Sequence, residues 1–351
     1  MKFLHSADLH LDTPFIGKSA QQAQFLREQL RAVPDQLARL CRQELCDLVL
    51  LSGDLFDGPW TRESLDSLRY ALEDCAVPVF ISPGNRDYVN PNSPYRTEHW
   101  PSNVHIFQRP QIESCLLEEL DCRVYGAGYR SADCGSLLDG FRREHDARYH
   151  IGVLHGDPTR ADSPCCPVTA DQVLRSGLDY LALGHIHKSG QFWQGRTLCA
   201  WPGCPMGRGF DETGTKGALL VTVRGDAQVR FVPLDTPRFF EETASTATLP
   251  QLLPSVGFRD FYRITLTGEG NQPPLSALYE RYSNFPNLEL IDHRSAPSAL
   301  WSQVDTDTLE GVYFRILQDA FKASDPETGQ IIELAAQLSW QILNGQEVVL
   351  P

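Results

Sequence analysis

Short apolar runs alternate with polar loops over the first two thirds of the chain, and each run has the length and residue types of a buried strand. The runs that predict strands cover residues 2–7, 47–52, 77–82, 123–126, 149–154, 179–183, 217–223 and 228–232. A helical period of apolar positions predicts helices over 20–45, interrupted at Pro34, and over 62–75 and 169–176. Residues 1–235 are therefore expected to form an α/β domain with layered, mixed sheets.

The composition changes at 234–254, where prolines flank a stretch rich in Ser, Thr and Ala, as is typical of a boundary between domains. Beyond it, the pattern predicts strands over 261–266 and 288–292 and helices over 274–282, 306–321 and 329–343. We expect these elements to form a smaller α/β domain over residues 255–345. The apolar stripes of its last two helices fit either the core of that domain or the binding of another protein.

The charge of the 351-residue chain argues against passive binding to polyanions, because 31 basic residues face 45 acidic ones and the formal net charge is −14. A nucleic acid would have to be held locally, and a metal centre could do so because divalent cations outweigh neighbouring carboxylates. The apolar runs are shorter than a membrane helix requires, and the first residues are too polar for a signal peptide. We expect a cytoplasmic protein without a membrane anchor, whose 10 scattered cysteines stay reduced.

Polar residues that suit a metal ion follow the carboxyl ends of the apolar runs. The segments are Asp8-Leu9-His10, Gly53-Asp54, Gly84-Asn85, His155-Gly156 and Gly184-His185-Ile186-His187. Side chains at the carboxyl ends of neighbouring strands meet in one crevice. Asp, His and Asn together suit divalent Mn, Fe, Zn or Mg, and a shared carboxylate can hold two such ions about 3.5–4 Å apart. Each segment alone is a common pattern, but all of them in this order predict a metal centre.

These segments resemble the signature of the calcineurin-like metallophosphoesterase superfamily, which reads D-x-H, G-D, G-N-H-[DE], H and G-H-x-H. Longer blocks are similar to the SbcD/YhaO-like DNA repair exonucleases, namely HSADLHLD at 5–12, SGDLFD at 52–57, LGHIH at 183–187 and WPGCP at 201–205. The resemblance covers residues 1–235 and implies a β-sandwich flanked by helices. Beyond it, only the position, length and mixed α/β pattern resemble the smaller capping domain of that subfamily.

The resemblance also implies a ligand set for two divalent ions, with manganese as the first expectation and iron, zinc or magnesium as alternatives. It assigns Asp8, His10, Asp54 and His187 to one ion, and Asp54, Asn85, His155 and His185 to the other. Asp54 would bridge the ions, and a hydroxide between them would attack phosphorus in line. The same resemblance places Asp54, Asn85, Arg86 and Asp87 in the catalytic machinery.

Position 86 departs from the family pattern, because the sequence reads Gly84-Asn85-Arg86-Asp87 where the family has the His of G-N-H-[DE]. The family's His contacts the phosphate and is thought to protonate the leaving oxygen. A guanidinium gives up no proton in a protein, so Arg86 could bind phosphate but could not act as a general acid. Alternatively, Arg86 pairs with Asp87 within the loop, and the sequence does not decide between the two.

The sequence therefore favours a metal-dependent phosphodiesterase, and the resemblance implies a DNA repair exonuclease subunit with DNA as its substrate. The chain has no G-x-x-x-x-G-K-[ST] phosphate loop, so the ATPase that the resemblance implies would be a separate SbcC-like partner. One alternative is a catalytically weakened subunit that binds DNA ends or acts as a scaffold, which Arg86 favours. Another is a phosphoesterase that acts on nucleotides or phosphoproteins, and a homodimer also stays open.

Overall fold

The chain divides into two compact units, residues 1–240 and 241–351, in the computed structural model. The structure describes the whole chain apart from residues 254–258, 269–271, 295–300, 302–303, 305 and 344–351. The first unit carries every residue that the sequence singles out for chemistry. The roles predicted for residues 1–235 and 255–345, a nuclease domain and a capping domain, stay predictions.

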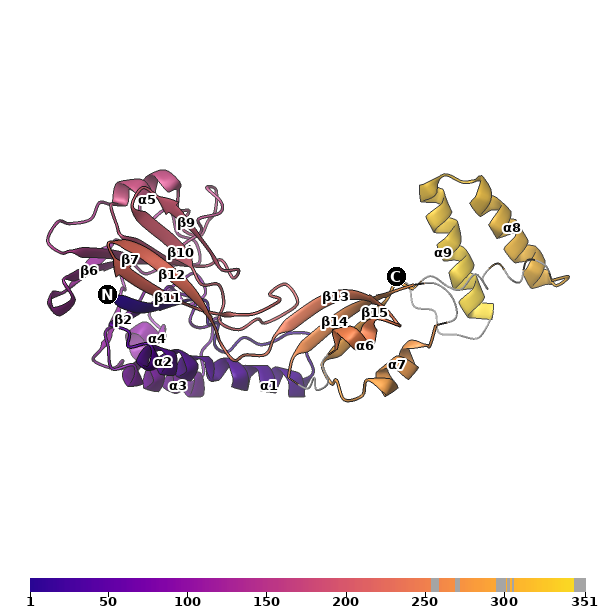
Figure 1. Ribbon diagram of the computed structural model, residues 1–351, viewed down its shortest axis with the longest axis horizontal. Helices are drawn as coiled ribbons and strands as arrows, with labels where there is room; N and C mark the ends of the chain where they lie inside the picture. The colour runs from indigo at the N-terminus through magenta and orange to yellow at the C-terminus, as the bar shows by residue number, and fades with distance from the viewer. Residues whose placement is uncertain (254–258, 269–271, 295–300, 302–303, 305, 344–351) are drawn as a thin grey trace. The chain divides into compact units, whose positions relative to one another are not determined.

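The first unit is built from two six-stranded sheets (Figure 1). One sheet has the order β12 (Asp226–Pro233), β11 (Gly217–Arg224), β1 (Lys2–Ser6), β2 (Leu48–Leu51), β3 (Val79–Ile81) and β4 (Val104–Ile106). The other has the order β5 (Glu113–Leu117), β6 (Cys122–Gly126), β7 (Tyr149–His155), β8 (Tyr180–Gly184), β10 (Thr197–Trp201) and β9 (Gly190–Gln194). Strands β1 to β4 run parallel to one another, and so do β6, β7, β8 and β10. Within each sheet, the carboxyl ends of these strands therefore lie at one edge.

A buried apolar cluster joins the two sheets. Its members include Phe3, Leu50 and Phe80 from the first sheet and Val124, Val153 and Tyr180 from the second. Parallel strands that are covered on both faces read as continuous apolar runs, which explains why all of Leu48–Leu51 is buried. The strands predicted from the apolar runs are confirmed, and the core that they share fixes the two sheets face to face.

Helices flank the sandwich: α1 (Ala20–Arg31), α2 (Val33–Gln43) and α3 (Arg62–Asp74) pack together on one side, and α5 (Ala170–Ser176) contacts β9 and β10 (Figure 1). The helix predicted over 20–45 is interrupted as expected, but the break falls at Ala32. Pro34 stands in the first turn of α2, where its missing N–H leaves no bond unmade. The expected mixed α/β fold, a sandwich flanked by helices, is confirmed.

Several short elements escape the sequence pattern. They are β4, β5, β9 and β10, the short helix α4 (Pro94–Thr97) and the 3-10 turn η1 (Glu118–Leu120). Strand β9 alternates half-buried and exposed residues and lies at the edge of its sheet, so it lacks the apolar run that marks a central strand.

The second unit holds most of a three-stranded sheet, β13 (Phe239–Ser245), β14 (Phe261–Thr267) and β15 (Leu288–Asp292), with helices α6 (Leu249–Leu252) and α7 (Leu275–Arg281). Strand β13 and helix α6 lie inside the stretch 234–254, so part of that stretch is regular structure rather than linker. Helices α8 (Leu309–Ala323) and α9 (Pro326–Leu343) pack together around Phe314 and Ala336. Among the described residues, no helix combines the length and the apolar character that a membrane crossing requires.

Candidate metal centre

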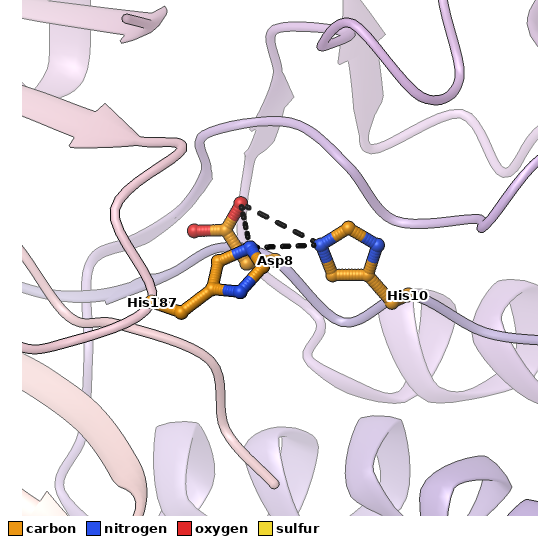
Figure 2. Close-up of side chains that lie close together, drawn as sticks. All are labelled: Asp8, His10 and His187. Carbon is orange, nitrogen blue, oxygen red and sulfur yellow. Dashed lines mark hydrogen bonds and ion pairs between the residues drawn. The ribbon is translucent and has the colours of Figure 1, made fainter. Parts of the chain in front are cut away.

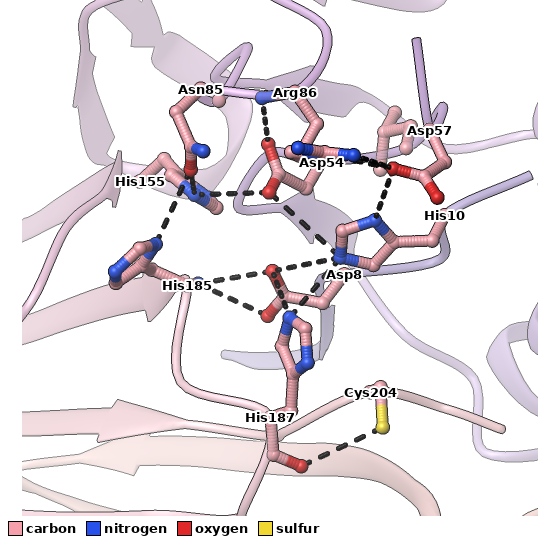
Figure 3. Close-up of polar contacts among 12 residues, drawn as sticks. Asp8, His10, Asp54, Asp57, Asn85, Arg86, His155, His185, His187 and Cys204 are labelled. Atoms are coloured by element: carbon pink, nitrogen blue, oxygen red, sulfur yellow. Dashed lines mark hydrogen bonds and ion pairs between the residues drawn. The ribbon is translucent and has the colours of Figure 1, made fainter. Parts of the chain in front are cut away.

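The strand ends of the first unit bring together all the residues that the sequence predicts as ligands (Figure 3). Asp8 and His10 follow β1, Asp54 follows β2 and Asn85 follows β3, all in the first sheet. In the second sheet, His155 is the last residue of β7, and His185 and His187 follow β8. Their role as ligands stays a prediction, but the convergence that the sequence predicted is present.

Asp8, His10 and His187 form one donor cluster (Figure 2). The Nε2 atoms of His10 and His187 lie 3.1 Å apart. Asp8 Oδ1 lies 4.0 Å from Nε2 of His10 and 3.9 Å from Nε2 of His187. Three donor atoms of different residues thus face one small volume, as the coordination of a divalent cation requires.

Asp54 lies between this cluster and a second group of donors. Its Oδ2 atom is 3.8 Å from His10 Nε2 and 3.5 Å from His155 Nε2. On the far side, Asn85 Oδ1 lies 2.9 Å from His155 Nε2 and 3.3 Å from His185 Nδ1. Asp54 therefore has the position that a carboxylate shared by two ions needs.

The hydrogen bonds of His155 show that this donor set fits a cation. His155 Nδ1 lies 2.8 Å from the carbonyl oxygen of Ser52, and His187 Nδ1 lies 2.6 Å from Glu212 Oε1. The Ser52 carbonyl takes the proton of His155 Nδ1, so Nε2 of His155 carries a lone pair, whereas Nδ1 of His187 lies within reach of both Glu212 Oε1 and Arg208 Nη2. For His155, this lone pair faces the acceptor oxygen of Asn85, 2.9 Å away, with no proton between them. A metal ion bound between these two atoms would accept both lone pairs.

Burial favours the neutral form of His10, His155 and His185 and disfavours the charged form of the two carboxylates. It lowers the pKa of His10 to about 3 and that of His155 and His185 to about 4. Burial also raises the pKa of Asp54 to about 7, and burial together with the charge of Asp54 raises the pKa of Asp8 well above its usual value. Neutral histidines and two buried carboxylates are the protonation states and charges that a divalent ion stabilises.

The backbone at these residues is held in an uncommon conformation. The φ angles of Asp8, His10, Asp54 and His185 are 53°, 48°, 51° and 86°, in the left-handed region that residues other than glycine rarely adopt. Gly53, with φ 86°, packs so closely that a Cβ would lie 2.6 Å from Nδ1 of His155. Strain of this kind persists where the surrounding structure fixes it, and it concentrates at functional sites.

Three charged residues that the sequence analysis did not single out lie at the Nδ1 side of His187 and His10. Glu212 binds His187 Nδ1 and is itself held by Arg208, whose Nη2 lies 2.6 Å from Glu212 Oε1. Burial raises the pKa of Glu212, but the hydrogen bonds to His187 and Arg208 outweigh it and keep the carboxylate ionised. Asp57 Oδ1 lies 3.6 Å from His10 Nδ1. Such carboxylate–histidine pairs orient ligands and strengthen their donor atoms.

Asp57 lies in the SGDLFD block and could have been found from it, since it stands three residues after Asp54. Glu212 and Arg208 lie in irregular chain after β10, and no periodicity or spacing marks them.

Arg86 pairs with Asp57, so the alternative that it pairs with Asp87 is wrong. Arg86 Nε and Nη2 lie 2.9 and 2.8 Å from Asp57 Oδ1, and 54% of the side chain stays exposed. Asp87 is buried and accepts hydrogen bonds from the N–H of Gly84, at 2.8 Å, and of Leu55, at 2.6 Å. Tyr95 O–H donates to the same oxygen as Leu55, so the buried Asp87 carboxylate is held by the loops around it and not by Arg86.

A β-sandwich whose parallel strands bring Asp, His and Asn donors together is the arrangement that the resemblance to metallophosphoesterases implies. Residues 1–189 match the calcineurin-like phosphoesterase family, and the chain belongs to that family. Its members use two divalent metals, and the superfamily resemblance seen in the sequence is confirmed.

The relatives support the narrower resemblance to SbcD/YhaO-like proteins. The chain is 34% identical over 250 residues to the uncharacterized metallophosphoesterase YhaO of Bacillus subtilis, a match of 66% of this chain and 60% of YhaO. It is 26% identical to the SbcD component of the nuclease SbcCD from B. subtilis, over 63% of this chain and 66% of the relative. It is also 26% identical to the DNA double-strand break repair protein Mre11 of Aeropyrum pernix, over 65% and 59%. The match thus spans about 60% of the first relative's length.

Among solved structures, a dimetal phosphatase from Danio rerio aligns with 66% of this chain and 96% of its own, at 15% identity and a TM-score of 0.46.

Proposed function

We propose that this protein is a manganese-dependent phosphodiesterase that cleaves DNA in the cytoplasm, as the exonuclease-type subunit of a repair complex with an SbcC-like ATPase. The observation that supports the chemistry is the position of Asp54 between two groups of donors, with Oδ2 3.8 Å from His10 Nε2 and 3.5 Å from His155 Nε2. The substrate and the partner draw on the named relatives, a nuclease component and a DNA repair protein.

The proposed ligands are those of the sequence analysis, with Asp54 shared between two ions. When bound, the ions supply a hydroxide nucleophile at neutral pH and neutralise the charge that develops on the phosphoryl oxygens. This local positive charge allows a chain of net charge −14 to bind a polyanion.

The loop around Asn85 contributes orientation. Asp87 accepts from the N–H groups of Gly84 and Leu55 and thereby ties the loop after β3 to the loop after β2. The N–H of Arg86 donates to Asp54 Oδ1 at 2.8 Å and holds the bridging carboxylate in place. Asp87 thus acts as a positioning residue in this proposal.

The Arg86 side chain would contact a phosphate of the substrate, because its guanidinium is half exposed and stands beside the donor set. It cannot protonate the leaving oxygen. The rate should therefore depend strongly on the acidity of the leaving group, and this same feature favours the alternative of a weakened, DNA-end-binding subunit.

The proposed ATPase contact lies on helix α8. Leu309, Val312 and Ile316 recur at helical spacing on one side of α8 and are exposed, with 87% of Leu309 and 63% of Ile316 accessible. Phe314 of the same helix is buried against α9. An apolar stripe beside a helix pair that already has its own core suits a partner helix, and a second copy of this chain is the competing occupant.

The test of the proposed activity is hydrolysis of bis(p-nitrophenyl) phosphate and of single-stranded DNA with manganese, before and after chelation. We expect manganese-dependent turnover of both, faster on the p-nitrophenyl diester. Turnover of the p-nitrophenyl diester with tight DNA binding but no DNA cleavage would support the scaffold alternative. Preferred hydrolysis of mononucleotides or phosphopeptides would support the other one.

A further inference from the structure

A cavity of about 320 Å³ shares one lining residue, His187, with the proposed metal centre. This volume is at the lower end of the range of about 300–1,000 Å³ that is typical of ligand pockets. The cavity is therefore large enough for one small ligand unit, and His187 links it to the proposed centre.

Two lysines line this cavity, Lys188 and Lys216. The whole chain has only five lysines, so the pocket concentrates a residue type that is rare in this acidic protein. Among the residues that the structure describes, neither ammonium group forms an ion pair or a side-chain hydrogen bond. Thr213 and Thr215 add hydroxyl groups to the same lining. Unpaired ammonium groups with nearby hydroxyls favour an anion such as a phosphate group.

An aromatic ring completes the lining. Phe231 of β12 is half-buried against the sandwich core and also borders the cavity. Its ring packs over Gly217, where a Cβ would lie 2.9 Å from the ring's Cζ atom. Aromatic rings next to basic side chains are the combination that binds single-stranded nucleic acid, because the ring stacks on a base while the cations hold the phosphates.

The walls of the cavity are fixed to the sheets that also carry the metal ligands. The N–H of Cys204 donates to the carbonyl of His187 at 3.2 Å, and Trp201 Nε1 donates to the carbonyl of Lys188 at 2.9 Å. Gly203, with φ 77°, approaches so closely that a Cβ would lie 2.5 Å from the same carbonyl of His187. The pocket and the centre therefore keep a fixed spacing.

We propose that this cavity binds the nucleotide next to the scissile bond of a single-stranded polynucleotide. Lys188 and Lys216 hold the phosphate of that nucleotide, and Phe231 stacks on its base. This assignment rests on the proposed phosphodiesterase activity and narrows its substrate to chains that have a flanking phosphate. A diester without one, such as bis(p-nitrophenyl) phosphate, reaches the metal centre without using the pocket.

The test compares the double variant Lys188→Ala/Lys216→Ala with the native protein. Binding of a fluorescein-labelled single-stranded oligonucleotide is followed by anisotropy with manganese at several salt concentrations. We expect at least tenfold weaker binding, and a salt dependence of log K that is shallower by about 0.7 for each phosphate that the variant no longer binds. The kcat/KM for bis(p-nitrophenyl) phosphate should stay within about twofold of native.

A second variant, Phe231→Leu, keeps an apolar side chain against the core and removes the ring. Stacking typically contributes about 1–3 kcal/mol per base, so binding should weaken about five- to 150-fold. The charge-matched control is Arg39→Ala/Arg175→Ala, which removes two exposed positive charges from α2 and α5. It should bind the oligonucleotide like the native protein.

Native affinity and native salt dependence in the lysine variant would overturn the assignment, and so would an equal loss in the arginine control, since net charge alone would then explain the effect. Neither result tests the proposed phosphodiesterase activity, because that activity is measured separately by hydrolysis of bis(p-nitrophenyl) phosphate. If the native protein hydrolyses no diester, the proposed activity fails, while the anisotropy data still decide whether the pocket binds a polynucleotide.

Discussion

The proposed metal centre of the first unit and the α8–α9 pair of the second differ in how many of their side chains have partners within the protein. Around the proposed centre, Glu212, Asp57 and Asp87 each have named partners, and the donors that remain face one another. On α8, by contrast, Leu309 and Ile316 face solvent although Phe314 is buried. The polar side chains of the first region are thus mostly bound to one another, whereas the second region exposes apolar side chains that could contact a macromolecule.

The largest expected effect tests whether Asp54 is shared by two ions. Asp54→Asn removes the bridging charge and should lower turnover by more than the about 10²–10³-fold that removal of one transition-state hydrogen bond costs. Since Asp54 raises the pKa of Asp8 by like-charge repulsion, the metal-free variant should melt no lower than the native protein. The measurements are manganese binding by calorimetry, kcat on bis(p-nitrophenyl) phosphate, and Tm.

The matched control for that change is Asp179→Asn. Asp179 is also buried, but it accepts from the N–H of His150 and pairs with Arg196 rather than facing the donor set. It should leave the manganese stoichiometry unchanged and lower Tm. Binding of two ions with native turnover in Asp54→Asn would refute the bridging assignment.

The sequence could predict that the donors converge because strand ends have a fixed geometry, whereas their role as ligands stays a prediction. Once Asp54 follows one parallel strand and His155 ends another, the sheets bring both to the same edge. The support behind the ligands was harder to predict. Glu212 reaches His187 through an irregular segment, and its contact depends on the path of that segment rather than on any periodic pattern.

Arg86 shows the same limit at a single residue. The sequence correctly showed that a guanidinium stands where the family has His, but it could not choose the acid that pairs with it. That choice depends on the packed loops, which bury Asp87 against the N–H groups of Gly84 and Leu55 and the hydroxyl of Tyr95, and leave Asp57 to the guanidinium. In the fold, the same reasoning applies to β9, an edge strand whose alternating residues carry no continuous apolar run.

The second prediction tests whether the first unit lacks a general acid at position 86. Arg86→His should raise the rate of DNA cleavage by up to the about 10²–10⁴-fold that general acid catalysis supplies. Hydrolysis of bis(p-nitrophenyl) phosphate should change little, because its leaving group needs no proton. Arg86→Ala should raise KM for both substrates, and kcat and KM on both substrates distinguish the variants.

An unchanged DNA rate in Arg86→His, together with unchanged KM values in Arg86→Ala, would remove Arg86 from the reaction. Its bond to Asp57 would then be its only role.

The third prediction concerns the support behind His187. Glu212→Gln keeps the size of the side chain but loses the charge that orients the imidazole, and such losses typically cost about 10- to 100-fold in metal affinity. We expect calorimetry with manganese to show one weakened site and one native site. The control Glu98→Gln alters a carboxylate that is likewise paired with an arginine, Arg62, on the surface. Equal weakening of both sites, or of neither, would contradict the assignment of Glu212 to one ion.

The smallest effect on stability and activity is expected for a substitution on α8. The same substitution tests whether the exposed apolar side chains of the second unit bind a partner. Ile316→Glu changes an exposed position, so the free energy of unfolding should shift by no more than about 0.5 kcal/mol and hydrolysis of bis(p-nitrophenyl) phosphate should be native. Burying a charge in the proposed interface should nevertheless weaken capture of the organism's SbcC-like ATPase at least tenfold, and the control Gln330→Glu on α9 should not.

Sedimentation velocity without the ATPase tests the competing occupant, a second copy of this chain. If the native chain is a dimer that Ile316→Glu dissociates while capture of the ATPase stays native, the apolar stripe of α8 joins two copies of this chain. The exposed apolar side chains of the second unit would then serve dimer formation rather than the binding of an ATPase.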